Sequence, residues 1–388
     1  MTEPIYLDHQ ATTPVDRRVL DKMIPYFGEV YGNSSSIDHI HGHKAKLAVD
    51  NAREQIANHL GCRKSREIIF TGGATEANNL ALIGVYRRSR DKGKHIIASS
   101  IEHPAVLDTL KYLEGEGAEV TLIPVDKYGV VDIEELKSSI TEETILVSVM
   151  FANNEIGTIQ PIKEIGEITR TNNVLLHVDA AQAVGHEIVH VYDMNIDLMS
   201  FSAHKFYGPK GVGGLFVRSF SPMVRLSPIS FGGGHERGLR PGTLNVPGII
   251  GMAEALSVAI EMQATEKERL HQLSSQIAST LQSSFPNIHI NGHPEKKLSH
   301  NLSLTIPDVE SKALIHTLKS KLSFSSGSAC STTKVEPSHV LSAIGLNDDE
   351  IFQTIRLGLG RSTKSADVIS DLLLKGIMQL RELRGQNI

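Results

Sequence analysis

Residues 70–220 alternate apolar runs with amphipathic stretches, and this alternation constrains the fold more than any other feature of the sequence. The stretches at 132–140 and 162–172 have apolar side chains at helical spacing. Because strands separated by helices favour a parallel sheet, the sequence predicts an α/β domain whose sheet is covered on both faces. The predicted strands cover residues 94–100, 118–125, 144–151, 173–179 and 197–202.

A different pattern follows residue 248, and it predicts a second, smaller α+β domain. Residues 248–285 contain no proline and predict one long helix. After it, the sequence predicts a strand at 300–307, a helix at 310–320, a loop of small residues at 323–333 and a last helix near 365–384. A chain of 388 residues suits two domains. We expect a large domain over residues 15–255 and a small domain built from residues 1–14 and 256–388.

Charge and composition exclude several classes of function. The formal net charge of −5 gives no basic field for nucleic acid. No run of about 18 apolar residues predicts a membrane span, and the first residues lack the basic and apolar regions of a signal peptide. The two cysteines, Cys62 and Cys330, lie far apart, so we expect no disulfide framework and a cytoplasmic protein. No metal site is predicted.

The residues that follow the predicted strands are candidate site residues, because ligands bind beyond the carboxyl ends of strands in open parallel sheets. Before the helix that starts near residue 75, Gly72 and Gly73 allow a ligand to approach the backbone, and Thr75 can cap that helix. The N–H groups of a helix N-terminus attract anions, so this segment predicts a phosphate site. The residues after the strands are Glu102, His103, Asn153, Asn154, Glu155, Asp179, Gln182, His204 and Lys205.

Together these groups match the needs of pyridoxal 5′-phosphate. That cofactor forms a Schiff base with a lysine, requires a carboxylate at its pyridine nitrogen and carries a phosphate. Lys205 supplies the amine, the acidic residues that follow the strands supply a carboxylate, and the Gly72–Gly73 segment supplies the phosphate site. A nicotinamide cofactor would require a Gly-x-Gly-x-x-Gly turn, and "TGGATEAN" lacks that spacing.

Taken one at a time, these residues also allow structural interpretations. The glycine segment could be a plain helix cap, and Lys205 a solvated loop lysine. Cys330 lies within residues 325–331, all of them small, which suits a nucleophile on a flexible loop but also an inert exposed thiol. Cys62 is interpreted as a structural residue.

Several longer motifs resemble the NifS/IscS-like cysteine desulfurases of the class V aminotransferase family, over residues 5 to 362. They are "IYLDHQATTPVD", "GGATEANN", "EHPAV", "NNEIGTIQPI", "HVDAAQAVG", "SFSAHKFYGPKGVGGL", "RPGTLNVPGI", "SSGSAC" and "RLGLGR". The resemblance implies the fold of pyridoxal-phosphate-dependent transferases and a homodimer. It also implies conversion of L-cysteine to L-alanine, with the sulfur carried as a protein persulfide to acceptors such as an iron–sulfur scaffold.

The resemblance assigns roles to individual residues. Lys205, His103 and Cys330 would be catalytic: the first as the Schiff-base lysine, the second stacked on the cofactor ring, the third as the persulfide carrier. Asn154 and Arg356 would bind the substrate carboxylate. The cofactor would be held by Ala74, Thr75, His103, Asn154, Asp179, Gln182, Ser202, His204, Lys205 and, from the neighbouring subunit, Thr243.

Two segments depart from the family pattern. Ser34 stands where the family usually has proline, and "DHQATT" carries a different pair before Ala-Thr-Thr. Neither departure is expected to touch a residue assigned to chemistry. We also expect residues 325–331 to be the most mobile part of the small domain, because no large side chain anchors them by packing.

Two other functions stay open at this point. One is a selenocysteine lyase or another pyridoxal-phosphate-dependent lyase or transaminase of the same fold. The other is a non-catalytic scaffold for sulfur transfer. Cys330 argues against a plain transaminase, which needs no mobile thiol, and the joint presence of Lys205, Asp179 and Cys330 argues against a scaffold.

Overall fold

The structure is a computed structural model that describes residues 3–327, 329–331, 334–383 and 385, with backbone alone for 329–331, 334 and 335. Its larger part is built on a seven-stranded sheet with strand order β2-β8-β7-β6-β5-β3-β4. All neighbouring strands are parallel except β8, which is antiparallel to both β2 and β7. The predicted α/β fold with a mainly parallel sheet is confirmed. The strands are β2 (Ile68–Thr71), β3 (His95–Ser99), β4 (Glu119–Ile123), β5 (Thr144–Ser148), β6 (Leu175–Asp179), β7 (Leu198–Ser202) and β8 (Gly213–Val217).

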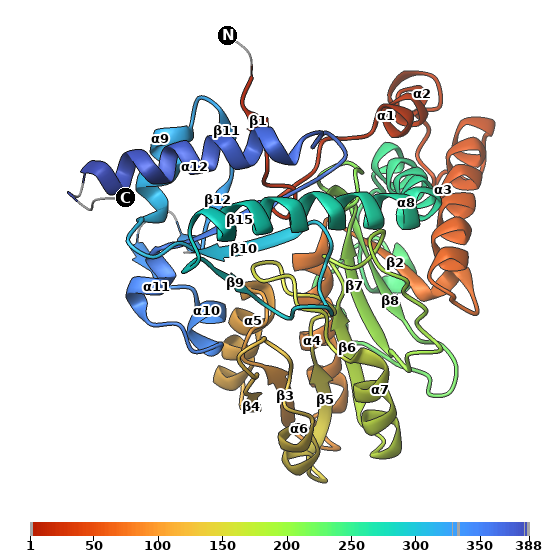
Figure 1. The fold of residues 1–388 in the computed structure, drawn as a ribbon. Coiled ribbons are helices and arrows are strands. Elements are labelled where there is room, and N and C mark those ends of the chain that lie inside the picture. The colour runs from red at the N-terminus through yellow and green to blue at the C-terminus, as the bar shows by residue number, and fades with distance from the viewer. Residues whose placement is uncertain (1–2, 328, 332–333, 384, 386–388) are drawn as a thin grey trace.

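Helices cover both faces of this sheet, which explains why the strands are apolar throughout (Figure 1). Neighbouring residues of β3 belong to different cores: Ile96 packs with α4 and α5, and Ile97 packs with α3, α7 and α8. The helices of this part are α1 (Arg17–Met23), α2 (Pro25–Gly28), α3 (Ile40–His59), α4 (Ala74–Ser89), α5 (Pro104–Gly115), α6 (Ile133–Ser139) and α7 (Ile162–Thr171), with short 3-10 turns at Ser65–Glu67, Ala203–Lys205 and Glu236–Gly238.

The glycines after Lys205 do more than turn the chain. Gly211 has a φ of 78° and makes the turn, but Gly213 and Gly214 lie inside β8. A Cβ on Gly213 would come within 2.5 Å of the Phe201 carbonyl oxygen and 2.7 Å of the Gly73 Cα. Gly213 therefore lets β8 lie directly against the start of α4, a contact that the sequence did not predict.

A second, four-stranded antiparallel sheet has strand order β12-β15-β10-β9. The long helix α8 (Val246–Ser284) joins the two parts and crosses the molecule beneath α12 in Figure 1. Its residues up to Ala259 pack in the core of the first sheet, and those from Leu270 pack with the second. The elements here are β9 (His289–Asn291), β10 (Asn301–Thr305), β12 (Ser325–Ser326), β15 (Thr354–Gly358), α9 (Ser311–Leu318) and α12 (Ala366–Leu383).

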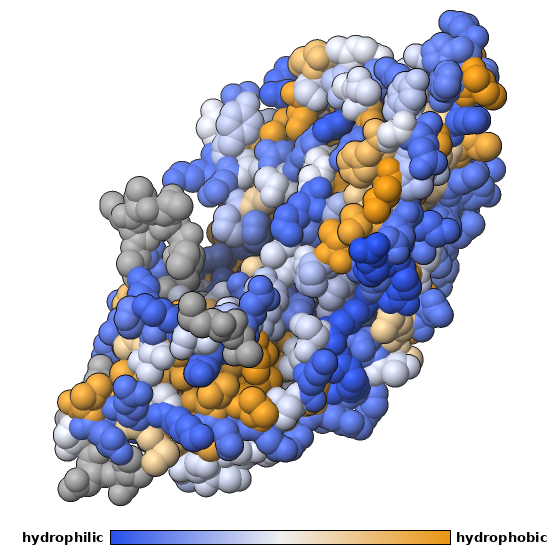
Figure 2. Space-filling view, turned by 90° about the horizontal axis from the view of Figure 1, so that it is seen from above, coloured by the Kyte–Doolittle hydropathy of each residue, from blue (hydrophilic) through white to orange (hydrophobic). Residues whose placement is uncertain are grey.

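The N-terminus lies with this second part, since β1 (Ile5–Tyr6) pairs with β11 (Leu322–Ser323) and Leu7 belongs to its core. None of the described helices is long and apolar enough to cross a membrane. The described residues also contain no group of histidine, cysteine or acidic side chains arranged to hold a metal ion. Seen from above, the surface is mostly hydrophilic, with hydrophobic residues gathered in separate patches (Figure 2).

The prediction of a loop at 323–333 is wrong, because the backbone forms short strands there. Besides β11 and β12, it contains β13 (Ala329–Ser331), which forms an antiparallel pair with β14 (Lys334–Glu336), so Cys330 lies in a hairpin. Short helices α10 (His339–Ala343) and α11 (Asp348–Phe352) follow. The side chain of Cys330 lies outside the described residues, and the mobility of this segment stays a prediction.

Candidate active site

A cavity of about 1030 Å³ opens at the carboxyl ends of the central strands. It gathers most of the residues that the sequence singled out, from both parts of the chain, but Glu102, Asn153 and Glu155 are not among its described lining residues. Thr243 is exposed and does not belong to the described lining of this cavity. The predicted residues that line the cavity are Ala74, Thr75, His103, Asn154, Asp179, Gln182, Ser202, His204, Lys205 and Arg356.

Lys205 lies on the 3-10 turn directly after β7, so the strand delivers its amine into the cavity. Its Nζ atom donates to the carbonyl oxygens of Gln10 and, at 3.0 Å, Ala11. Burial, and after it the positive charge of Arg356, lowers the pKa of the Lys205 amine to about 8. A substantial fraction of the amine is therefore neutral near physiological pH and available as a nucleophile.

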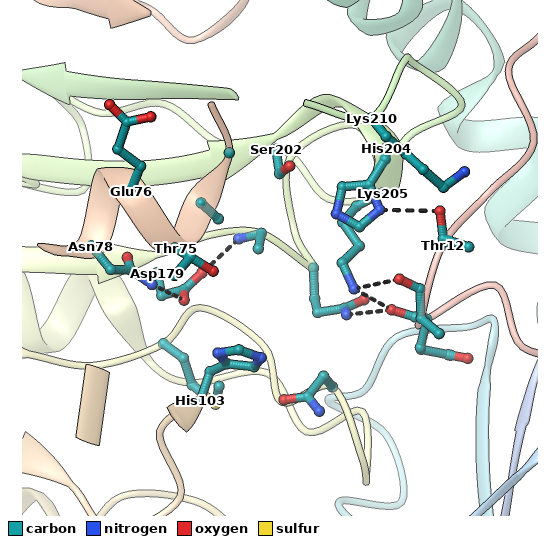
Figure 3. Close-up of a pocket in the computed structure, with 18 of the residues that line it drawn as sticks. Thr12, Thr75, Glu76, Asn78, His103, Asp179, Ser202, His204, Lys205 and Lys210 are labelled. Atoms are coloured by element: carbon teal, nitrogen blue, oxygen red, sulfur yellow. Dashed lines mark hydrogen bonds between the residues drawn. The ribbon is translucent and has the colours of Figure 1, made fainter. Parts of the chain in front are cut away.

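Asp179 ends β6 on the other side of the cavity, where Figure 3 shows it beside Asn78 and Thr75. Its carboxylate accepts hydrogen bonds from Asn78 Nδ2 at 2.6 Å and from the backbone N–H of Ala181 at 2.9 Å. These donors hold the buried carboxylate in one orientation. The Oδ1 atom of Asn78 is buried and has no partner among the described residues.

His103 begins α5 as its N-cap, and its Nδ1 atom accepts a hydrogen bond from the backbone N–H of Ala105 at 3.1 Å. One face of the ring stays open to the cavity (Figure 3). Loss of water around the rest of the His103 ring lowers the pKa of this imidazole. His103 is therefore a neutral aromatic ring with Nδ1 as acceptor, suited to lie against a flat ligand.

The helix start for which the sequence predicted a phosphate site is the N-terminus of α4, although Thr75 does not cap the helix. Gly73 is the N-cap, with a φ of 155° that residues with side chains rarely adopt, and Thr75 is the second helical residue. A Cβ on Gly73 would lie 3.6 Å from Ser202 Oγ. No side chain of residue 73 therefore lies between the first N–H groups of α4 and Ser202, so an anion could approach those N–H groups there.

His204 stands at the other edge of this region and is neutral. Its Nδ1 atom lies 3.2 Å from Thr12 Oγ1. Burial, together with the charges of Lys205 and Lys210, lowers the pKa of the imidazole to about 4. A neutral ring can donate one hydrogen bond to an anion without adding charge.

Arg356 enters the cavity from β15 of the second sheet. Its Nη1 atom donates to the Asn154 carbonyl oxygen at 2.8 Å, and its Nη2 atom lies 2.9 Å from Asp8 Oδ1. The Nε atom is buried without a partner among the described residues. The fork is thus held in place beside Asn154, as binding of a carboxylate requires.

The N-terminal segment supplies site residues that the sequence did not predict. Besides the contacts of Asp8 and Thr12, the Gln10 carbonyl oxygen accepts from Gln182 Nε2 at 3.0 Å as well as from Lys205. The expectation that the unusual pair in "DHQATT" touches no chemical residue is therefore wrong. No local sequence pattern reveals these contacts. Asn78 could have been predicted as a site residue, because it follows Thr75 by three residues and therefore lies on the same face of the helix.

Comparison with known proteins agrees with this geometry. A family model described as aminotransferase class-V matches residues 5–370. A "Cysteine desulfurase IscS" of Methanosarcina thermophila is 46% identical over 382 residues, which make up 98% of this chain and 93% of the relative. The chain belongs to the cysteine desulfurases of the class V aminotransferase family.

Two solved structures are similar to the chain over nearly all of its length. A structure titled "NIFS-LIKE PROTEIN" has a TM-score of 0.90 and 38% identity, and the match covers 98% of this chain and all of that one. A structure titled "SspA in complex with cysteine" has a TM-score of 0.79 and 36% identity, with 92% and 99% covered. The predicted family and fold are thereby confirmed.

Cysteine desulfurases of this family use pyridoxal 5′-phosphate, and the residues present fit it. Three groups line one cavity: the partly neutral amine of Lys205, the oriented carboxylate of Asp179, and the start of α4, where Gly73 carries no side chain. The unpartnered Asn78 Oδ1 offers a further acceptor there. The cofactor predicted from the sequence is therefore consistent with the chemistry of the site.

Proposed function

We propose that this protein is a pyridoxal-phosphate-dependent cysteine desulfurase, which converts L-cysteine to L-alanine and transfers the sulfur to Cys330 as a persulfide. The observation that carries the proposal is the partly buried Lys205, whose amine has a lowered pKa and shares one cavity with the oriented carboxylate of Asp179. Membership of the desulfurase family narrows the chemistry that this pair can perform.

The bound cofactor would supply an electron sink for the substrate. Lys205 would attach it and, once its amine is released, carry the proton to and from the substrate α-carbon. Asp179, oriented by Asn78, would keep a ring nitrogen protonated. His103 would cover one face of the ring, Gln182 would bond the ring hydroxyl, and the phosphate would lie among Ala74, Thr75, Ser202 and His204.

The substrate carboxylate would be bound by Arg356 and Asn154, which already contact one another. Cys330 as thiolate would attack the substrate sulfur, because a thiol is a poor nucleophile. The carbon–sulfur bond breaks with its electron pair left on carbon, which takes a proton, while a sulfur–sulfur bond forms. L-cysteine and an enzyme thiol thus give L-alanine and an enzyme persulfide.

We propose a homodimer in which Thr243 completes the phosphate site of the neighbouring subunit. Its exposure outside its own cavity supports this arrangement. So do large exposed hydrophobic side chains, which mark interaction surfaces when they gather. They are Leu20, Ile24, Phe27, Tyr31, Ile37, Ile40 and Leu47 near α1–α3, and Phe220, Met223 and Phe231 before Thr243.

We further propose the domain division 15–255 and 1–14 with 256–388, which the two sheets and their separate cores support. A cytoplasmic location and transfer of sulfur to an acceptor protein such as an iron–sulfur scaffold complete the proposal.

The test is to supply the purified protein with L-cysteine and a thiol reductant and to measure alanine and sulfide. We expect equal amounts of both, and we expect Lys205→Ala to produce neither and to lose the visible absorbance of lysine-bound cofactor. Activity with selenocysteine but not with cysteine, or retention in Lys205→Ala of both turnover and the absorbance of lysine-bound cofactor, would overturn the proposal.

A further inference from the structure

The hairpin β13–β14, which carries Cys330, is fixed to the rest of the protein at both of its ends. At the upstream end, the Gly327 N–H donates to the Thr354 carbonyl oxygen at 2.7 Å. A Cβ on Gly327 would come within 2.7 Å of Leu341 Cδ1 and 2.9 Å of Thr354 Cβ. The backbone therefore enters the hairpin pressed against β15 and α10.

At the downstream end, two consecutive side chains bind the loops that form the cavity. Ser338 Oγ, which is fully buried, donates to Glu155 Oε2 at 2.5 Å. His339 Nε2 lies 2.9 Å from the Glu102 carbonyl oxygen and must donate to it, because a carbonyl only accepts. Ser338 also caps α10, so the chain leaves the hairpin in a defined direction.

Each of these partners is adjacent to a residue of the active site. Glu155 follows Asn154, and Glu102 precedes His103. Both partners are themselves held: Asn153 Oδ1 accepts from the Glu155 N–H at 2.8 Å, and the Glu102 carboxyl accepts from the Met150 N–H at 2.7 Å. The Ser338 hydrogen bond therefore ends on the Glu155 side chain and the His339 hydrogen bond on the Glu102 backbone, and both partners are held beside the cavity by further hydrogen bonds.

A separate hydrophobic cluster reinforces the same connection. It joins residues from the strand-end loops of the large sheet with residues of α10 and α11. Its members are Ile101, Met150, Ile156, Val340, Leu341, Ile344 and Ile351. Because α10 is packed in this way, a change at the hydrogen bonds affects the direction of the hairpin more than the folding of the helix.

Resting on the proposed function, we propose that Ser338 and His339 are positioning residues that fix the Cys330 hairpin relative to His103 and Asn154. They act on the transfer of sulfur and not on the binding of cofactor or cysteine. Neither side chain lines the described part of the cavity. A misplacement of about 1 Å between reacting groups can cost roughly a hundredfold in rate, so such residues can control the transfer step.

The experiment uses cofactor-loaded protein with three substitutions at one position. His339→Leu and His339→Phe remove the donor and keep an apolar side chain, whereas His339→Gln keeps an N–H donor. We expect the first two to lower kcat by about tenfold or more with KM within about twofold, and His339→Gln to recover most of the loss. His316→Leu, on the exposed face of α9, is the matched control and should behave as the unsubstituted protein.

Three readouts separate positioning from a merely structural effect. Cofactor content and the cysteine-induced change in visible absorbance should be unchanged in the His339 variants, while the single-turnover rate of persulfide formation falls. An unchanged persulfide rate in His339→Leu and His339→Phe, or a loss matched by equal losses of cofactor and cysteine binding, overturns the inference and leaves the proposed function standing. Absence of alanine from the unsubstituted protein overturns both.

Discussion

The lowered pKa of Lys205 leads to a direct prediction about its reactivity. Burial, and then the charge of Arg356, lowers the pKa from 10.5 to about 8. At pH 7, about one amine in ten is then neutral, against about three in ten thousand for an ordinary lysine. The cofactor-free protein should therefore present roughly 300 times more neutral amine at this position than an unperturbed side chain would.

Competitive acetylation measures this quantity. Cofactor-free protein is treated with trace acetic anhydride between about pH 6 and pH 11, and mass spectrometry quantifies the peptide that contains Lys205. We expect a midpoint near 8, and a higher midpoint in Arg356→Gln because a neighbouring positive charge is lost. A midpoint near 10.5, or a lower midpoint in Arg356→Gln than in the unsubstituted protein, would show that burial and Arg356 do not lower the pKa of Lys205.

The same shift has a consequence for stability. Because the folded pKa lies below the unfolded one, the unfolded chain binds more protons between about pH 8 and pH 10.5. This group's contribution to the stability of the cofactor-free protein therefore rises with pH across that window, and Lys205→Met should remove that contribution. An identical pH dependence of the unfolding midpoint in Lys205→Met would contradict the assignment.

Three further substitutions test the site. Asp179→Ala should fold but lose about a hundredfold or more of kcat, and a loss within about threefold would show that its carboxylate is not needed. Arg356→Lys keeps the charge but loses the fork, so the KM for cysteine should rise about tenfold, and an unchanged KM counts against its role. Gly213→Ala places a Cβ against backbone of Phe201 and Gly73 and should cost about 1–3 kcal/mol, visible as a lower unfolding midpoint. The control Gly115→Ala meets no atom within 4 Å and should be neutral or stabilising.

The sequence predicted which residues lie at the strand ends, because the alternation of apolar and amphipathic stretches shows where each strand ends. His103, Asp179 and Lys205 each follow an apolar run, and parallel strands bring such positions to one edge of the sheet. Arg356 and Cys330 were different, since only the resemblance to a family connected them with this edge.

Other features depend on contacts between distant segments, so no local pattern reveals them. The carbonyl groups of Gln10 and Ala11 reach Lys205 across nearly two hundred residues of chain. Gly213 is required where β8 packs against Gly73, which lies 140 residues earlier in the chain. Thr75 has the side chain of a helix cap, yet Gly73 takes the cap position of α4 and leaves the backbone there without a side chain.

The proposed reaction requires that Cys330 receives the sulfur. The protein is incubated with L-cysteine without reductant, alkylated and digested, and mass spectrometry locates the added sulfur atom. We expect it on Cys330 and not on Cys62, because burial raises the pKa of the Cys62 thiol and suppresses its thiolate. Cys330→Ser should still bind cofactor and cysteine but form no persulfide. A persulfide on Cys62, or steady release of alanine by Cys330→Ser, would contradict the account.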